Sequence, residues 1–327
     1  MRLLCGIDEA GYGPLLGPLT IARAVIEVPD ADDPEQPIDV WSLVTRAVHK
    51  TLTGRKGRLV VADSKKFGIR TAGLTNLEAS CLAFAHAAGC DTTRADLFFD
   101  ALSETTHQQL DHLPWYAPTA EHPWQSLPTA STPGEHAIAR SMLQTTLTAA
   151  NVRIRDLGLS LVFEDTFNDL VAKTHSKASA SFTYVARHLI AIWRDHGRQH
   201  PHVVIDRQSG RTRYRELLAM LLPDAQLRIL DETPQRSAYQ LTEADRTITV
   251  SFETKADGNH FPVALASMLA KYSRELMMDR LNSYFIRHLP DLKPTAGYTT
   301  DGRRFMNDLK PHLPALDIHP HSLCRIA

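Results

Sequence analysis

The sequence predicts an α/β fold in which helices flank a mixed sheet. Short apolar runs that fit buried strands alternate along the chain with segments of helical periodicity, and this alternation is typical of one sheet covered by helices. Apolar residues make up 43% of the 327 residues and charged residues 22%, the balance of an ordinary globular protein. A chain of this length can bury roughly three quarters of its extended surface, so it needs no disulfide or zinc site to fold.

The first strands are expected close to the beginning of the chain. An apolar run at residues 3–7 ends at two acids, and the Ile- and Val-rich stretch 19–28 follows a turn of glycines and prolines. We expect these two strands to pair antiparallel across this short connection, with an acidic surface loop after the second. Further apolar runs predict additional strands at 58–61, 157–163, 203–205, 226–230 and 247–252.

Helices are expected between these runs. Apolar side chains at spacings of three to four predict a helix around residues 74–84. Pro262 fits the first turn of a long helix that extends to about residue 285. Other helices are expected at 135–150, between 163 and 196, and at 214–222.

The stretch at about 101–150 has a different character. Prolines recur every four or five residues up to Pro133, and we interpret the stretch as an irregular insertion that drapes over the surface before its closing helix. A lid, a partner surface and a neutral insertion are all compatible with it. The insertion contains four histidines whose spacing fits no established metal-ligand pattern, so we expect them at the surface: His107, His112, His122 and His136.

Charge and cysteine usage exclude several classes of protein. The four cysteines, at 5, 81, 90 and 324, lack the spacing of a zinc ribbon or a redox motif, and scattered thiols suit the cytoplasm. No apolar run approaches the roughly 20 residues of a membrane span, and the first run is too short for a secretion signal. With 36 basic and 37 acidic residues the net charge is −1. Any nucleic-acid-binding surface must therefore be local.

Four acids follow strands or turns: Asp8, Glu9, Asp206 and Asp257. Acids that leave neighbouring strands at the same edge of a sheet converge, and clustered carboxylates repel one another unless a divalent cation lies among them. Oxygen ligands suit Mg²⁺ or Mn²⁺ rather than zinc, and such sites usually carry out phosphoryl transfer. Taken singly, each acid fits a turn or a helix cap better than a metal ligand.

The surrounding motifs resemble a known family. Residues 6–18 read Gly-Ile-Asp-Glu-Ala-Gly-Tyr-Gly-Pro-Leu-Leu-Gly-Pro, which closely resembles the opening signature of ribonuclease HII, the type 2 ribonuclease H family. The resemblance continues, in the family's order, through Asp63-Ser64-Lys65-Lys66, Lys255-Ala256-Asp257 with the helix after it, Gly297-Tyr298, and Ile318-His319 to Ser322. It covers nearly the whole chain except about 101–150 and 231–245.

The resemblance implies a ribonuclease H-like fold: one catalytic domain over residues 1–327, with a C-terminal helical extension from about 259. It implies that Asp8, Glu9, Asp206 and Asp257 hold Mg²⁺ or Mn²⁺ and are the catalytic residues. Asp206 is identified only by its position after residues 203–205. Glu164 and Asp165, which lie before a helix, are interpreted as caps.

The implied substrate is an RNA–DNA hybrid or duplex DNA that contains ribonucleotides, bound by a cytoplasmic monomer. Discrimination requires sensing of the ribose 2′-hydroxyl, which the backbone of Gly11, Tyr12 and Gly13 could approach closely. Ser64, Lys65 and Lys66 are expected to contact the substrate, and Tyr298 to stack on a sugar. Tyr12, where the common form has Arg or Lys, and Pro320-His321, where it has Arg-Arg, reduce the positive charge available to phosphates.

Three basic clusters could supply a local phosphate groove: Lys65, Lys66 and Arg70; Arg207, Arg211, Arg213 and Arg215; and Arg303 and Arg304. The leading hypothesis is a metal-dependent endonuclease that hydrolyses RNA in such duplexes and leaves 3′-hydroxyl and 5′-phosphate ends. The alternatives are a non-catalytic hybrid-binding protein that retains the fold and a metal-dependent phosphatase acting on small nucleotides.

Overall fold

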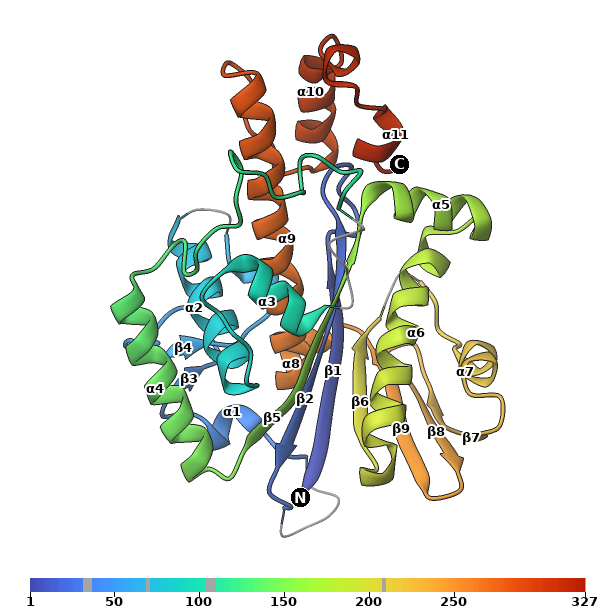
Figure 1. Cartoon of the computed structure of the whole chain (residues 1–327). Helices are drawn as coiled ribbons and strands as arrows, with labels where there is room; N and C mark the ends of the chain where they lie inside the picture. Colours follow the sequence, from blue (N-terminus) through green and yellow to red (C-terminus); the bar gives the residue numbers. More distant parts are fainter. Residues whose placement is uncertain (32–36, 69–70, 104–109, 208–209, 327) are drawn as a thin grey trace.

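A seven-stranded mixed sheet runs through the centre of the molecule, with helices on both faces (Figure 1). The computed structural model describes residues 1–31, 37–68, 71–103, 110–207 and 210–326. The strand order is β5-β2-β1-β6-β9-β8-β7. The predicted fold class, an α/β fold with a mixed sheet and flanking helices, is therefore confirmed.

The middle of the sheet brings the first strand beside two strands from the second half of the chain. β1 (Arg2–Ala10) pairs antiparallel with β2 (Leu19–Val28), as predicted, and β2 pairs antiparallel with β5 (Arg153–Val162). On its other side β1 pairs parallel with β6 (His202–Asp206), and β6 pairs parallel with β9 (Arg246–Glu253). Because Ile7 lies opposite Ile205, Asp8 and Asp206 follow at the same edge of the sheet.

Next to one edge strand of the sheet lies a strand that we did not predict. β8 (Arg236–Glu243) lies between β9 and β7 (Gln226–Glu232) and pairs antiparallel with both. Its sequence mixes three apolar residues with Arg, Ser, Gln, Thr and Glu, so it lacks an apolar run of its own. The stretch becomes a strand because both neighbours supply backbone partners.

The two faces of the sheet bury separate apolar cores. On one face lie α9 (Phe261–His288), α2 (Thr71–Ala87), α3 (Ala95–Leu102) and α4 (Pro133–Ala149), and on the other α5 (Glu164–Thr174), α6 (Lys177–His196) and α7 (Arg215–Leu221) (Figure 1). Leu3, Cys5 and Ile7 of β1 belong to the α6 core. Gly6 faces α9, where a Cβ would lie 2.2 Å from the Pro262 backbone. By the alternation of a strand, Asp8 faces α9 and Glu9 faces α6.

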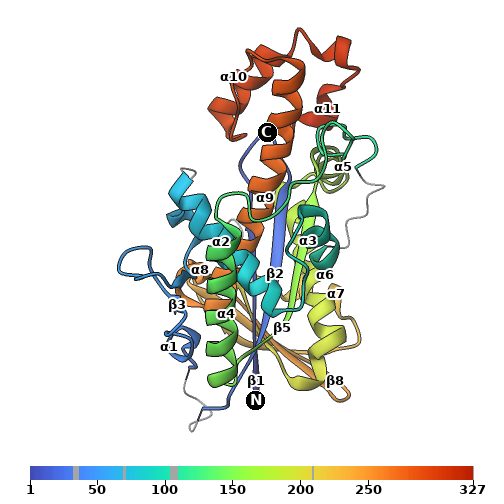
Figure 2. The same ribbon diagram turned by 60° about the vertical axis from the view of Figure 1, so that its left-hand side comes forward.

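Several short elements complete the fold. They are α1 (Val40–Leu43), β3 (Val48–His49), β4 (Leu59–Val60), α8 (Ala256–Asn259), α10 (Thr299–Leu309), α11 (Pro320–Leu323) and the 3₁₀ turns Ser64–Lys66, Gly197–Gln199 and Leu313–Leu316. α9 begins beside the predicted start of the C-terminal extension, with Pro262 in its first turn. Its far end, α10 and α11 extend beyond the sheet (Figure 2). In the part of the chain that the structure describes, no helix combines the length and apolar character needed to span a membrane.

The insertion is not draped over the surface. Within its described part, Trp115 and Tyr116 are almost fully buried in the α9 core. Arg280 of α9 donates hydrogen bonds to the carbonyls of four insertion residues: Tyr116, Ala117, His122 and Pro123. Glu78 of α2 accepts hydrogen bonds from three consecutive backbone amides at 129–131. These buried charges replace regular pairing for an irregular backbone, so the insertion is part of the core.

Two of the histidines in the insertion also differ from expectation. His122 and His136 are buried rather than at the surface, and burial lowers the pKa of His122 to about 4, with Arg280 adding to the effect. His112 is exposed and its Nε2 lies 2.6 Å from an Asp165 carboxylate oxygen. His107 lies outside the described residues, as does part of the expected acidic loop at 30–37.

Candidate metal and nucleic-acid site

Three of the four predicted metal acids come together at one edge of the sheet. Asp8 lies near the end of β1, Asp206 ends the neighbouring β6, and Asp257 lies in α8 directly after β9. The Asp206 Oδ1 accepts a hydrogen bond of 2.8 Å from the Ala256 amide, which ties the end of β6 to α8. The strand order therefore brings residues separated by about two hundred positions to one place.

Burial and neighbouring carboxylates raise the pKa values of these acids. Burial, and then the Asp206 carboxylate, raises the pKa of Asp8 well above its usual range, although a hydrogen bond from Ser267 of α9 opposes the shift. Burial also raises the pKa of Asp206. The pKa of Asp257 is raised to about 6 by burial, by Asp63 and by Asp206. Crowded carboxylates with raised pKa values are typical of functional sites.

Asp63 also belongs to this cluster, although the sequence analysis quoted it only as part of the Asp63-Ser64-Lys65-Lys66 motif and did not name it as a site residue. It precedes the 3₁₀ turn Ser64–Lys66, where its carboxylate accepts a hydrogen bond of 2.8 Å from the Lys65 amide. It also raises the pKa of Asp257. Its position after the apolar run at 58–61 matches that of the other acids, which is the signal that could have identified it.

Lys65 supplies the counter-charge to this cluster. Its Nζ lies 3.7 Å from Asp257 Oδ2. Burial alone would lower the pKa of Lys65. Four carboxylates together raise it by more than burial lowers it, so the net shift is upward: Asp257, Asp8, Asp206 and Asp63. The ammonium group therefore lies where several negative charges can stabilise a cation.

Glu9 lies beside the cluster but faces the other side of the sheet. Its Oε2 accepts a hydrogen bond of 3.2 Å from Ser181 of α6, whereas Asp8 is bonded by Ser267 of α9. Glu9 is close enough to raise the pKa of Asp8. Its role as a metal ligand stays a prediction.

The chemistry of these residues fits a divalent cation. Among the described residues, no three His, Cys, Asp or Glu side chains form a ready-made metal-binding group as they lie. However, Asp257 Oδ2 is buried and has no hydrogen-bond partner within the described ranges, although the Lys65 ammonium lies 3.7 Å away. A buried oxygen without a hydrogen bond carries a free-energy cost. Oxygen donors with raised pKa values would be stabilised by Mg²⁺ or Mn²⁺ rather than by a soft metal.

The glycine loop, residues 11–18, begins where β1 ends. Gly11 has φ +82°, and a Cβ there would lie 2.8 Å from the Pro18 carbonyl oxygen, so only glycine fits without strain. Gly13 is exposed and faces open space. Tyr12 instead packs against the α6 core, and burial followed by the Glu9 charge raises its pKa. Of the three predicted contact residues in this loop, Gly13 has the most open surroundings.

Tyr298 lies next to the glycine loop. Its side chain is exposed, at 54% of the residue surface. The preceding Gly297 accepts hydrogen bonds from the amides of Leu15 and Leu16, at 2.8 and 3.2 Å. Gly297 has φ +81°, and a Cβ there would lie 2.4 Å from the Leu16 carbonyl oxygen. The two predicted substrate-contacting segments are thus joined through their backbones.

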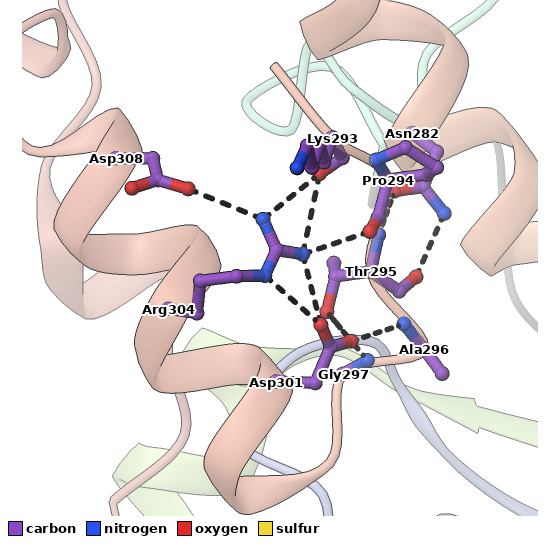
Figure 3. A network of polar contacts seen from close by, with 9 residues as sticks. All are labelled: Asn282, Lys293, Pro294, Thr295, Ala296, Gly297, Asp301, Arg304 and Asp308. Carbon is purple, nitrogen blue, oxygen red and sulfur yellow. Dashed lines mark hydrogen bonds and ion pairs between the residues drawn. The ribbon is translucent and has the colours of Figure 1, made fainter.

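A polar network, which we call the Tyr298 clasp, holds the segment that precedes Tyr298 (Figure 3). Asp301 of α10 accepts hydrogen bonds from Thr295 Oγ1, at 2.6 Å, and from the Ala296 amide, at 2.8 Å. Arg304 donates to the carbonyls of Lys293 and Pro294 and to the carboxylates of Asp301 and Asp308. Asn282 of α9 pairs with the Thr295 backbone in both directions. The clasp fixes the segment that presents Tyr298.

The remaining predicted contact residues are distributed differently. Lys65 and Lys66 are exposed, whereas Ser64 is buried, with its hydroxyl 2.9 Å from that of Ser267. Arg207 donates to the Thr233 carbonyl and to Ser237 Oγ, and Arg304 belongs to the clasp. These two arginines of the predicted basic clusters therefore have structural partners, while Arg70 lies outside the described residues.

Glu164 is not a helix cap as predicted. It is fully buried in the first turn of α5, and its Oε1 accepts hydrogen bonds from the Gly17 amide, at 2.8 Å, and from the Tyr116 hydroxyl, at 2.9 Å. Burial raises its pKa to about 7, against hydrogen bonds that oppose the shift. Glu164 therefore links the glycine loop to the insertion.

Comparison with known proteins supports the resemblance. Residues 224–307 match the family model of ribonuclease HII. A segment of 39 residues is 49% identical to ribonuclease HII from Azoarcus sp. (strain BH72), and this match spans 12% of this chain and 16% of the relative. The resemblance indicated by the motifs is thus confirmed over this part of the chain.

Solved structures of ribonucleases HII, H2 and HIII align over most of the chain at low identity. Ribonuclease HII of Archaeoglobus fulgidus, solved in a complex with PCNA, is 15% identical, with a TM-score of 0.40 over 99% of this chain and 94% of that one. Ribonuclease H2 of Pyrococcus horikoshii OT3 is 15% identical, with a TM-score of 0.39 over 98% and 92%. Bst-RNase HIII in complex with Mn²⁺ is 13% identical, with a TM-score of 0.41 over 99% and 66%.

Proposed function

We propose that this chain, in which residues 224–307 match the ribonuclease HII family, is a metal-dependent endonuclease. Its substrates are the RNA strand of RNA–DNA hybrids and ribonucleotides embedded in duplex DNA. The observation that carries this proposal is the convergence of Asp8, Asp206 and Asp257 beside the glycine loop. We further propose that the protein acts as a cytoplasmic monomer.

The acids would hold Mg²⁺ or Mn²⁺, with Glu9 as the fourth ligand. A bound cation of this kind activates water and stabilises the leaving oxygen in phosphoryl transfer. The products are then a 3′-hydroxyl and a 5′-phosphate end. Lys65 balances part of the carboxylate charge and, with the exposed Lys66, offers cations to the phosphates that flank the cut.

Recognition of the ribose would rely on the glycine loop and Tyr298. The open surroundings of Gly13 allow a sugar to approach the backbone closely, and backbone groups can read the 2′-hydroxyl that distinguishes RNA from DNA. The exposed ring of Tyr298, held beside this loop through Gly297, supplies a flat apolar surface on which a sugar can stack.

A cleavage map tests the proposal. Duplexes that carry none, one, four or many ribonucleotides are incubated with the protein in Mg²⁺ or in Mn²⁺, beside the Asp257→Asn variant. We expect cuts only at ribonucleotides, and at least a hundredfold loss of rate in Asp257→Asn. Asp245→Asn serves as the control, because this exposed acid pairs with Arg198 and lies at the turn between β8 and β9, at the opposite end of these strands from Glu253 and the cluster.

Two outcomes would contradict the proposal. Undiminished cleavage by Asp257→Asn would remove the metal-site argument. Tight binding of a hybrid without turnover in either metal would favour the alternative, a non-catalytic hybrid-binding protein, which the Tyr12 and Pro320-His321 departures motivate. The crowded carboxylates argue against this alternative, since unused clustered charges destabilise the folded state.

A further inference from the structure

Arg325 binds the backbone of the glycine loop from its buried side. Its side chain is almost fully buried, at 2% exposure, although it lies more than three hundred residues from the loop. Its Nη2 donates hydrogen bonds to the carbonyls of Gly11 and Pro14, both at 2.5 Å. Its backbone amide donates to the Leu15 carbonyl at 2.8 Å. One residue therefore binds three carbonyls within five positions of the loop.

The segment that carries Arg325 is itself anchored. Asn168 of α5 donates from Nδ2 to the carbonyls of His321 and Cys324, both at 2.9 Å, and accepts at Oδ1 from the Ile326 amide at 2.7 Å. The Arg325 guanidinium lies over the Phe167 ring of the same helix, 5.1 Å from its centroid. Arg325 is thus placed by α5 and not only by its own bonds to the loop.

Burying the Arg325 side chain carries a free-energy cost. The Nε and Nη1 atoms have no hydrogen-bond partner in the part of the chain that the structure describes. Arg274, which donates to the Leu16 and Pro18 carbonyls, lies close enough to lower the pKa of Arg325 further, after burial has lowered it, to about 9. An apolar side chain would fill the same volume without burying a charge. An apolar side chain, however, cannot donate hydrogen bonds to the carbonyl oxygens of the loop.

The two carbonyl bonds orient the peptides of the loop. In a planar trans peptide the carbonyl and the next amide point in opposite directions. Because the Gly11 carbonyl points at Arg325, the Tyr12 amide points away from this buried guanidinium. The Pro14 carbonyl points at Arg325 as well, and the Leu15 amide then donates to Gly297. Arg325 thereby sets the directions in which the Tyr12 and Leu15 amides point, and with them the junction between the loop and the Tyr298 segment.

We propose that Arg325 is a positioning residue that sets the backbone of the glycine loop for recognition of the ribose 2′-hydroxyl. This inference rests on the proposed function, because it assigns the loop that role. Arg325 does not touch the substrate; it acts through the carbonyls of Gly11 and Pro14.

The test compares Arg325→Met and Arg325→Lys with the wild type and with Arg198→Met, a control that removes an exposed guanidinium paired with Asp245. Hydrogen exchange of the backbone amides at 11–13 and 15–17 is measured against that of β2 and β9. Affinity is measured in Ca²⁺, for a duplex with one ribonucleotide and for the all-DNA duplex of the same sequence.

For Arg325→Met we expect faster exchange confined to the loop and at least a tenfold loss of ribonucleotide preference. We expect the effects of Arg325→Lys to lie between those of the wild type and Arg325→Met, because a single ammonium group replaces the planar guanidinium.

The outcomes separate this inference from the proposed function. A wild type that shows no ribonucleotide preference contradicts the proposed function, and the inference falls with it. A wild-type preference that Arg325→Met leaves unchanged, or unchanged exchange at 11–13 and 15–17, overturns the inference alone. If Arg325→Met does not fold, Arg325→Lys decides: a folded lysine variant with full preference overturns the inference, and one with a reduced preference supports it.

Discussion

At the scale of single residues, the carboxylates around Asp257 lower the stability of the folded protein. Asp8, Asp206 and Asp257 all have raised pKa values because burial and repulsion by neighbouring carboxylates, Asp63 among them, disfavour their charged forms. Charges of this kind destabilise the folded protein until a cation neutralises them. Activity and stability should therefore respond in opposite directions to the loss of one carboxylate.

We expect Asp257→Asn to melt higher than the wild type in EDTA at pH 7.5, by about 2 °C, since it removes one of the repelling charges. The gain is small because Asp257 is partly balanced by the exposed Lys65. Mg²⁺ should raise the melting temperature of the wild type more than that of the variant, because at equal concentration a ligand that binds the folded state more tightly stabilises it more. Thermal melts in EDTA and in Mg²⁺ check both statements, and a variant that melts lower in EDTA would contradict the repulsion argument.

Glu164 predicts a pH dependence of stability. Its pKa is raised to about 7 in the folded protein, against 4.5 as the ordinary value. Between these values the folded state binds the proton more tightly than the unfolded chain, so the contribution of Glu164 to stability falls as pH rises from about 4.5 to about 7. We expect Glu164→Gln to remove this loss. Relative to the wild type it should gain, on going from pH 5 to pH 8, on the order of 3 kcal/mol at most.

Urea unfolding at pH 5, 6, 7 and 8 measures this difference. Glu216→Gln is the control, since Glu216 is an exposed acid in the first turn of α7. A stability difference between Glu164→Gln and the wild type that does not change with pH would show that the Glu164 carboxyl titrates normally.

At the scale of elements, the segment before Tyr298 is held by α10 and α9. Asp301→Ala removes the acceptor of Thr295 and Ala296 and one partner of Arg304. If the segment presents Tyr298 to the substrate, its release should raise KM about tenfold and change kcat little, as for loss of a contact made equally in ground and transition states. Steady-state kinetics on a single-ribonucleotide duplex provides the measurement.

Asp308→Ala is the matched control for Asp301→Ala. It also removes a carboxylate partner of Arg304, but this partner lies one turn beyond Arg304, on the other side of it from Asp301, and is half-exposed. Arg304 keeps its bonds to the Lys293 and Pro294 carbonyls, so we expect less than a twofold change in KM. Equal effects of both substitutions would show that the charge of α10, and not the clasp, affects binding.

At the scale of the whole molecule, the insertion is bound to the sheet by buried charges. Arg280 holds four of its carbonyls, and its guanidinium also lies 4.1 Å from the centroid of the Trp124 ring. Arg280→Met would leave these buried acceptors unpaired, so we expect a loss of about 3–5 kcal/mol in the free energy of unfolding. Urea unfolding followed by tryptophan fluorescence measures it. Arg287→Met, an exposed position on the same helix, should change it by less than about 0.5 kcal/mol.

Local patterns in the chain were enough to identify most strands and the long helices. The apolar run before Asp8 and the Ile- and Val-rich stretch after the glycine loop form β1 and β2 as predicted, because burial on both faces leaves a continuous apolar signal. Pro262 marks the start of α9 for an equally local reason. The acids could be located in the same way, since each follows an element that is itself recognisable.

Features that depend on distant partners could not be found in this way. β8 lacks an apolar run and forms between two strands that pair with it. The apolar run at 58–61 gives a local signal for Asp63, but its closeness to Asp257, whose pKa it raises, follows from contacts across the fold. Trp115 and Arg280 show that a proline-rich stretch can be core when buried charges satisfy its backbone.

The periodicity of apolar residues, which acts over a few positions, was thus sufficient for the α/β architecture and for the approximate places of Asp8, Asp206 and Asp257. Which faces these side chains take, which of them share one desolvated space, and which charge lies beneath the glycine loop were decided by the folded chain. The physical reason is range: strand and helix patterns are local, whereas desolvation and Coulomb energies depend on neighbours that can be as far apart in sequence as Gly11 and Arg325.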